Sequence, residues 1–267
     1  MGSSLRSLAK RAWTAAAPNA AGALTASRAR AHSQRLIRRW GLAEINERLS
    51  REVGSRVLSG PFTGLCLTSE AFQEHAGPFL LGTYESELHP WWNDLLNQSF
   101  DLIVDIGAKF GYYAVGLALK FPSAAVVAFD TDWWARRATR QLATANGVSN
   151  VTVSSRCDGR WLTNNVAGRA LVVSDCEGYE GRLFCHTSAD VLRATTLLVE
   201  THEQAVPGVT ADLEAHFART HSVRRVVSRA TTSVPDGIRV RSLTLDELRR
   251  ASAEVRPQQT WLLLTPR

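Results

Sequence analysis

Several features that would restrict the class of protein are missing from this chain of 267 residues. It has no apolar run near the length of about 20 residues that a membrane-spanning helix needs, so we predict no transmembrane segment. Its four cysteines show no C-x-x-C spacing, and the N-terminus lacks the apolar core of a secretory signal. We therefore expect a cytoplasmic protein with reduced thiols.

Acidic residues are absent from the first part of the chain. Residues 1–43 hold no Asp or Glu, whereas the remainder has slightly more acidic than basic residues, so the net charge of +6 belongs to an N-terminal arm. We predict that residues 1–40 form a flexible basic arm, with an organellar transit peptide or a peripheral membrane contact as alternatives. The near-neutral body and the lack of a DNA- or RNA-binding motif predict no nucleic-acid partner.

Helical periodicity precedes the first predicted strand. Apolar residues recur at intervals of three and four from Leu42 to Val57, which is typical of an amphipathic helix. A second helical stretch is predicted over 84–98, with Pro90 as an interruption. We therefore predict a helical N-terminal extension over 41–99 that packs on the sheet, with a lid over a cofactor site as the alternative.

Short apolar runs alternate with helical patterns from residue 100 onward. The first run, "FDLIVDIG", ends in glycine and is typical of a buried parallel strand. The alternation predicts an α/β fold over 100–267: a doubly wound, mostly parallel, Rossmann-like seven-stranded sheet with helices on both faces. A short helix capped by Ser188 is predicted before the fifth strand. The later strands are predicted within 124–130, 169–178 and 195–203, and in "NVTVSS", "SVRRVVS" and "TWLLLTP".

A glycine loop follows the first predicted strand. Asp105, Gly107 and Gly111 fall beyond its carboxyl end, where open parallel sheets bind their ligands. Glycine lets the backbone approach a ligand closely, and the next helix offers free N–H groups to an anionic group. Asp130 ends the second strand, where a carboxylate can accept hydrogen bonds from both ribose hydroxyls. The pattern indicates an adenosine-containing cofactor, with a tight turn without a ligand as the alternative.

The loop does not match the dinucleotide fingerprint G-x-G-x-x-G, because Lys109 stands where its second glycine would be. This disfavours a nicotinamide-dependent oxidoreductase. In order along the chain, "VDIGAKFGYYAVGLA", "AFDTD", "NGVSNVTV", "SDCEGYE" and "LLVETHE" resemble the FkbM-type branch of class I S-adenosylmethionine-dependent methyltransferases. The resemblance covers roughly residues 100–204. It departs from the family pattern at Lys109, where Asn is usual, and in "FDTD", where E-P-D is usual.

The resemblance implies a role for each matching residue. S-adenosylmethionine would bind along the loop, with Asp130 on the ribose and Asp158 near the adenine. His202 is the favoured base for the acceptor's proton, since its ordinary pKa lies near about 6.5; a purely supporting role is the alternative. The implied cofactor-binding residues are Asp105, Gly107, Lys109, Gly111, Tyr112, Asp130 and Asp158, and the implied catalytic residues are His202, Asp175 and Glu177.

The function implied by the resemblance is O-methylation of a small-molecule or sugar hydroxyl. Asp175, Glu177, Glu200 and His202 also form an oxygen and nitrogen ligand set that suits Mg²⁺, but the sequence does not favour a metal site, since carboxylates at strand ends are common without metal. The alternative function is a catalytically inactive Rossmann-like module that binds a nucleotide or a partner. The departures at Lys109 and in "FDTD" favour that alternative.

Overall fold

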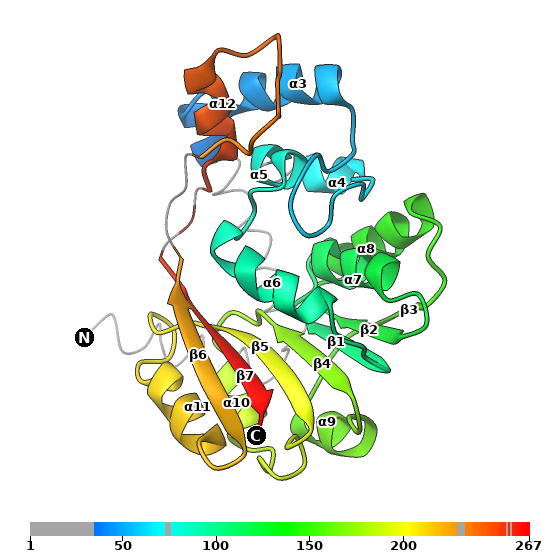
Figure 1. Ribbon diagram of the computed structural model, residues 1–267, viewed down its shortest axis with the longest axis vertical. Coiled ribbons are helices and arrows are strands. Elements are labelled where there is room, and N and C mark those ends of the chain that lie inside the picture. Colours follow the sequence, from blue (N-terminus) through cyan, green and yellow to red (C-terminus); the bar gives the residue numbers. More distant parts are fainter. Residues whose placement is uncertain (1–34, 73–75, 229–232, 255, 257) are drawn as a thin grey trace, which may run out of the picture.

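The computed structural model describes residues 35–72, 76–228, 233–254, 256 and 258–267. Most of the predicted basic arm therefore lies outside the described residues, and so does its predicted membrane contact. Within the described ranges, no helix is long and apolar enough to cross a membrane. The chain is built around one seven-stranded sheet, with a group of helices at one end of the molecule (Figure 1).

The strand order of the sheet is β3-β2-β1-β4-β5-β7-β6. Strands β1 to β5 pair in parallel, whereas β7 runs antiparallel to both β5 and β6. The chain moves outward from β1 to β3 and then returns to add β4 and β5, so a topological switch point lies between β1 and β4. This confirms the predicted Rossmann-like fold. The strands are β1 (Leu102–Ile106), β2 (Ala125–Phe129), β3 (Val151–Ser154), β4 (Ala170–Ser174), β5 (Thr195–Thr201), β6 (His221–Val227) and β7 (Thr260–Pro266).

Alternating side chains of the strands feed two hydrophobic cores. In β1, Ile103 belongs to one core and Val104 to the other, because successive side chains of a strand point to opposite faces. Residues of α7 and α8 belong to the first core together with apolar residues from 37–100 and 240–251, and residues of α9, α10 and α11 complete the second. The helices are α7 (Tyr112–Lys120), α8 (Trp133–Ala145), α9 (Gly159–Asn165), α10 (Glu180–Phe184) and α11 (Val209–Phe217).

The helical group at the end of the molecule brings together an early and a late segment of the described chain. Helix α3 (Leu42–Val53) lies beside α12 (Leu245–Ser252), and both pack against α5 (Ala76–Leu81) (Figure 1). Arg48 and Glu247 form an ion pair of 2.7 Å between α3 and α12. Helix α12 lies in the range predicted for the sheet domain, yet it packs with the N-terminal helices. The remaining helices are α4 (Ser69–Phe72), the 3₁₀ helix η1 (Ser86–Leu88) and α6 (His89–Leu96).

Two local predictions are wrong. Pro90 does not interrupt a helix but lies in the first turn of α6, where its missing N–H would have no helical partner anyway. Residues 189–194 form turns instead of the predicted helix. Hydrogen bonds there run from Val191 N–H to the carbonyl oxygen of Ser188, and in the same way across the next turns. These bonds join residues three apart, whereas an α-helix needs bonds between residues four apart.

Candidate functional site

The loop between β1 and α7 contains three residues with positive φ, namely Gly107 (88°), Lys109 (52°) and Gly111 (92°). A Cβ atom on Gly107 would lie 1.7 Å from the main-chain oxygen of Asp175, and one on Gly111 would lie 2.8 Å from Cγ2 of Thr139. The loop is therefore pressed against the end of β4 and against α8. These contacts alone explain why glycine is needed at both positions. They therefore agree with the alternative interpretation, a tight turn that binds no ligand.

Asp105 and Asp130 fasten this loop with their carboxylates. Asp105 Oδ2 accepts a hydrogen bond of 2.9 Å from Ala114 N–H, and burial raises the pKa of Asp105 to about 7 although this bond opposes the shift. Asp130 accepts main-chain hydrogen bonds from Lys109 (2.9 Å) and Asp132 (2.8 Å), and burial raises its pKa as well. Each carboxylate oxygen has a second lone pair, so Asp130 can still accept hydrogen bonds from a ligand.

The side chains of Tyr112 and Asp158 are committed to the chain itself. The Tyr112 ring is buried and lies edge-on to two phenylalanine rings, so it belongs to the core. The distances between ring centroids are 5.3 Å to Phe62 and 4.9 Å to Phe79. Asp158 is exposed at the start of α9, where its Oδ1 accepts a hydrogen bond of 2.8 Å from Trp161 N–H as a helix cap. The cofactor-binding role of both residues stays a prediction, and Tyr112 could serve it only through its main chain.

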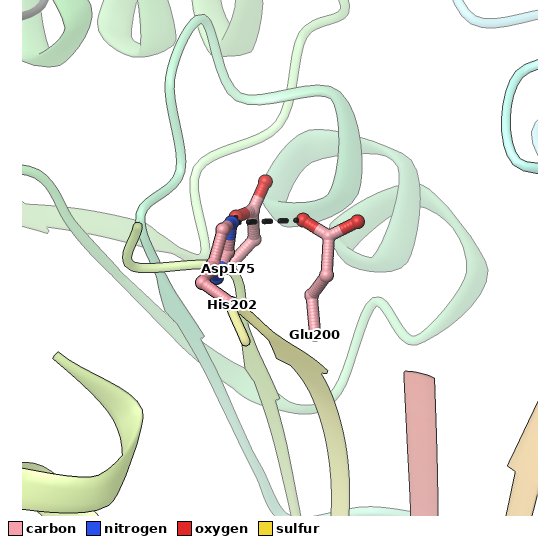
Figure 2. Close-up of side chains that lie close together, drawn as sticks. All are labelled: Asp175, Glu200 and His202. Carbon is pink, nitrogen blue, oxygen red and sulfur yellow. Dashed lines mark ion pairs between the residues drawn. The ribbon is translucent and has the colours of Figure 1, made fainter. Parts of the chain in front are cut away.

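His202 lies among carboxylates beyond the ends of β4 and β5. Its Nδ1 is 2.8 Å from Glu180 Oε1. Its Nε2 lies 3.5 Å from Asp175 Oδ1, from Glu177 Oε2 and from Glu200 Oε2. Figure 2 shows Asp175 and Glu200 beside the imidazole ring. We call these five residues the His202 cluster; it brings together all three predicted catalytic residues.

Burial and charge compete within the His202 cluster. Burial acts to lower the pKa of His202, but its hydrogen bond with Glu180 and the surrounding negative charges raise it overall. Burial opposes ionisation of Glu180, yet the same hydrogen bond leaves the pKa of that carboxyl lowered. Burial and the charge of Asp175 raise the pKa of Glu200. The prediction of His202 as a base assumed an ordinary pKa, whereas these surroundings shift the imidazole toward its protonated form.

A network on the far side of Glu200 was not predicted from the sequence. The Arg256 side chain is 20% exposed, and its guanidinium bonds to four carboxylates. Two of them belong to η1 and to the residue before it, one to β5 and one to the segment after α12. The partners are far apart in the chain, so no local pattern signals the contact. The four distances are 3.0 Å to Glu85, 2.8 Å to Glu87, 2.8 Å to Glu200 and 2.7 Å to Glu254.

Comparisons with known proteins do not assign a family. No family model matches the sequence, and no curated protein matches it. Among solved structures, precorrin-6Y C5,15-methyltransferase from Geobacter metallireducens is 12% identical over 69% of this chain and 85% of that chain, with a TM-score of 0.44. An rRNA methylase from Streptococcus thermophilus is 14% identical over 67% and 96% of the two chains, with a TM-score of 0.45.

A third solved structure, the human methyltransferase 10 domain containing protein, is 12% identical over 68% of this chain and 80% of that chain, with a TM-score of 0.44. All three TM-scores lie below 0.5. The fold assignment therefore rests on the strand order described above, and any function rests on the residues of the site.

Proposed function

We propose that this chain is an S-adenosylmethionine-dependent methyltransferase that methylates a hydroxyl oxygen of a small molecule or sugar. The observation that carries the proposal is that the 107–111 loop and the His202 cluster meet at the switch point of the sheet, where Gly107 touches the main chain of Asp175. A cofactor along the loop would thus lie next to the cluster. The sequence resemblance to FkbM-type methyltransferases supports the same activity.

The donor set of the site fits this cofactor. Asp130 lies at the end of β2, bonded to the loop, and keeps lone pairs for the ribose hydroxyls. When bound, S-adenosylmethionine supplies an electrophilic methyl group on a positively charged sulfur. The carboxylates of Asp175, Glu177 and Glu200 make the neighbouring site negative, which favours a cation there. We further propose that Asp105, Gly107, Lys109 and Gly111 shape the loop and that Asp158 lies toward the adenine.

An acceptor hydroxyl must lose its proton during methylation, and two groups of the cluster are proposed to take it. His202 is 6% exposed and is held by Glu180 so that its Nε2 faces the other carboxylates. The Glu177 side chain is 85% exposed, so its carboxylate can pass a proton on to solvent. Asp175, the member of the cluster that touches the loop, is proposed to orient the acceptor.

Calorimetric titration with S-adenosylhomocysteine tests the proposal, with NAD⁺ as the control ligand. We expect micromolar binding of S-adenosylhomocysteine and no binding of NAD⁺, since the loop lacks the dinucleotide fingerprint. Failure to bind S-adenosylhomocysteine, or tighter binding of NAD⁺, would reject a methyltransferase.

A catalytically inactive module that binds a nucleotide or a partner is the second candidate function. It is favoured by two observations: contacts within the chain already explain both loop glycines, and each oxygen of Asp130 already accepts a hydrogen bond from the main chain. This candidate predicts S-adenosylhomocysteine binding without passage of a labelled methyl group from S-adenosylmethionine to any member of a panel of sugars and small hydroxyl compounds. Transfer of label to any of them excludes it.

A further inference from the structure

His202 presents a ring nitrogen that faces three carboxylates at ion-pair distance but beyond the usual length of a hydrogen bond. Its side chain is 6% exposed, and its Nδ1 is taken by Glu180. Within the part of the chain that the structure describes, the closest carboxylate oxygens to its Nε2 lie at 3.5 Å. An N–H···O hydrogen bond measures about 2.7–3.2 Å. Nε2 thus points into the cluster, and the space between this nitrogen and the carboxylate oxygens is wider than a hydrogen bond.

We propose that Asp175, Glu200 and His202 bind a divalent metal ion of the Mg²⁺ or Mn²⁺ class. One ligand atom from each of the three residues lies within 4.8 Å of the other two, and the three side chains face one another (Figure 2). Neighbouring ligand atoms at about 2.1 Å from a metal ion are separated by roughly 3.0–3.4 Å. The 3.5 Å spacing around His202 Nε2 is close to this separation, so the gap has the size of a coordinated ion.

An independent observation comes from the carboxylate of Asp175. Among the described residues, its Oδ1 is buried and has no hydrogen-bond partner. A buried carboxylate oxygen without a partner lowers the stability of the fold, because it has lost its hydrogen bonds to water and no protein group replaces them. This oxygen is the atom that lies 3.5 Å from His202 Nε2. A metal ion between the two would supply the missing partner to both.

Glu180 orients the imidazole as a metal site requires. A carboxylate only accepts hydrogen bonds when it is ionised, so Nδ1 carries the hydrogen in the 2.8 Å contact. A metal ion that displaces the proton of Nε2 would then bind the lone pair of that nitrogen. Metal-ligating histidines commonly donate their other ring N–H to a carboxylate in this way. The Glu180 carboxylate is itself fixed by hydrogen bonds from the N–H groups of Cys176 and Gly178.

The charge around the cluster also favours a cation. Arg256 bonds to Glu200, but it is shared with Glu85, Glu87 and Glu254. Its single positive charge is therefore divided among four carboxylates, and it does not bond to Asp175. The mixed set of two carboxylates and one imidazole suits a divalent ion of borderline hardness such as Mn²⁺, with Mg²⁺ as the alternative of the same geometry.

This inference extends the proposed function. The metal site itself does not depend on that function, but the role of the ion in the reaction rests on it. Three protein ligands leave coordination positions for water or for acceptor oxygens. A hydroxyl bound to the ion would lose its proton more readily, and the proton would pass to the carboxylate of Glu177, because His202 would serve as a ligand. The favoured acceptor is one with two adjacent oxygens, such as neighbouring hydroxyls of a sugar, since both could coordinate.

Titration calorimetry of the full chain with MnCl₂, after treatment with EDTA and without any cofactor, tests the site. We expect one saturable site per chain, with Mg²⁺ as a competitor. Asp175→Asn, Glu200→Gln and His202→Asn should each weaken Mn²⁺ binding by at least about 10-fold, and Glu180→Gln by about 10- to 100-fold through loss of orientation. His186→Asn, at an exposed position, and Glu214→Gln, at a half-buried one outside the cluster, serve as controls and should bind Mn²⁺ unchanged.

Thermal unfolding shows which variants fold, and pulsed EPR of Mn²⁺ bound to the unaltered chain should detect a directly coordinated nitrogen. Absence of saturable Mn²⁺ binding, absence of that nitrogen signal, or unchanged affinity in folded His202→Asn would each overturn the inference. S-adenosylhomocysteine binding without Mn²⁺ binding would overturn the metal site and leave the methyltransferase proposal standing. Mn²⁺ binding without S-adenosylhomocysteine binding would overturn the methyltransferase proposal and leave the metal site standing.

Discussion

The two ends of the site use the same kinds of residue in different ways. At the ends of β1 and β2, the carboxylates of Asp105 and Asp130 accept hydrogen bonds from the main chain of the loop and of the following helix segments. At the ends of β4 and β5, Asp175 and Glu200 lie 3.5 Å from His202 Nε2 and make no hydrogen bond to it. The first end is complete as protein structure, whereas the second concentrates negative charge that the shared Arg256 and the imidazole of His202 balance only in part.

This difference teaches that a glycine loop alone is weak evidence for a ligand. The loop glycines are required by the packing of the chain, whatever binds there. The His202 cluster has no comparable packing explanation, because Arg256 reaches Glu200 alone among its described carboxylates and Asp175 Oδ1 is left buried without a hydrogen-bond partner. The evidence for function is therefore stronger at the β4 and β5 end, and the following predictions test that contrast.

The largest effect is expected where the two ends touch. Gly107→Ala would place a Cβ atom 1.7 Å from the main-chain oxygen of Asp175, at a residue with φ of 88°. We expect a loss of more than about 4 kcal/mol in the free energy of unfolding, measured by urea denaturation. Gly168→Ala is the matched control, since its φ is 69° but nothing lies within 4 Å of its Cβ position. It should lose about 1–2 kcal/mol, and equal losses in both variants would contradict the close contact.

The Arg256 network should come next in magnitude. Arg256→Met leaves buried carboxylates without their cation, and we expect a loss of about 3–5 kcal/mol in the free energy of unfolding. Arg169→Met is the control, because Arg169 is 64% exposed in its ion pair with Asp101 and should cost less than about 1 kcal/mol. Similar small losses in both variants would show that Arg256 does not support the Glu200 side of the cluster.

The two ends should respond separately to ligands. Asp130→Ala should weaken S-adenosylhomocysteine binding by roughly 1.5–3 kcal/mol, because hydrogen bonds to a charged group are lost. Its Mn²⁺ affinity should not change, since Asp130 bonds to the loop and belongs to the other end. Calorimetry of both ligands on the same preparation measures this, with the exposed Asp101→Ala as the control. Unchanged S-adenosylhomocysteine affinity would remove Asp130 from the cofactor site.

The smallest effect is expected at Lys109, where the sequence departs from the family pattern. Its φ of 52° lies in the left-handed region, which Asn adopts more readily than Lys. Lys109→Asn should therefore raise the free energy of unfolding by about 0.5–1 kcal/mol. Lys109→Ala, which shares the truncation but not the conformational preference, should give no gain in urea denaturation. A gain in both variants would point to the charge of Lys109 instead of its backbone.

The sheet could be predicted from the sequence because its strands are short apolar runs separated by helical patterns. The side chains of β1 and β4 face apolar neighbours on both sides, so period and length suffice to identify them. Asp175, Glu177 and His202 could be placed together for a related reason. They follow two strands that pair in parallel, whose carboxyl ends meet at one edge of the sheet.

Contacts between distant segments could not be predicted in this way. The ion pair of Arg48 with Glu247 joins residues 199 positions apart, and Arg256 gathers carboxylates from three regions of the chain. Neither leaves a periodic signal, because each depends on how finished elements pack. The raised pKa of His202 could not be predicted for the same reason. The hydrogen bond with Glu180 raises this pKa against the effect of burial, and only the folded chain creates that bond.

Hydrogen–deuterium exchange of the full chain with and without saturating S-adenosylhomocysteine tests the central claim most directly. If the loop at the switch point holds the cofactor, exchange should slow in peptides covering residues 105–113 and 130–134, with no change at residues 99–101, at the opposite end of β1. Unchanged exchange in the loop peptides at millimolar S-adenosylhomocysteine would contradict the account and leave the loop as a structural turn.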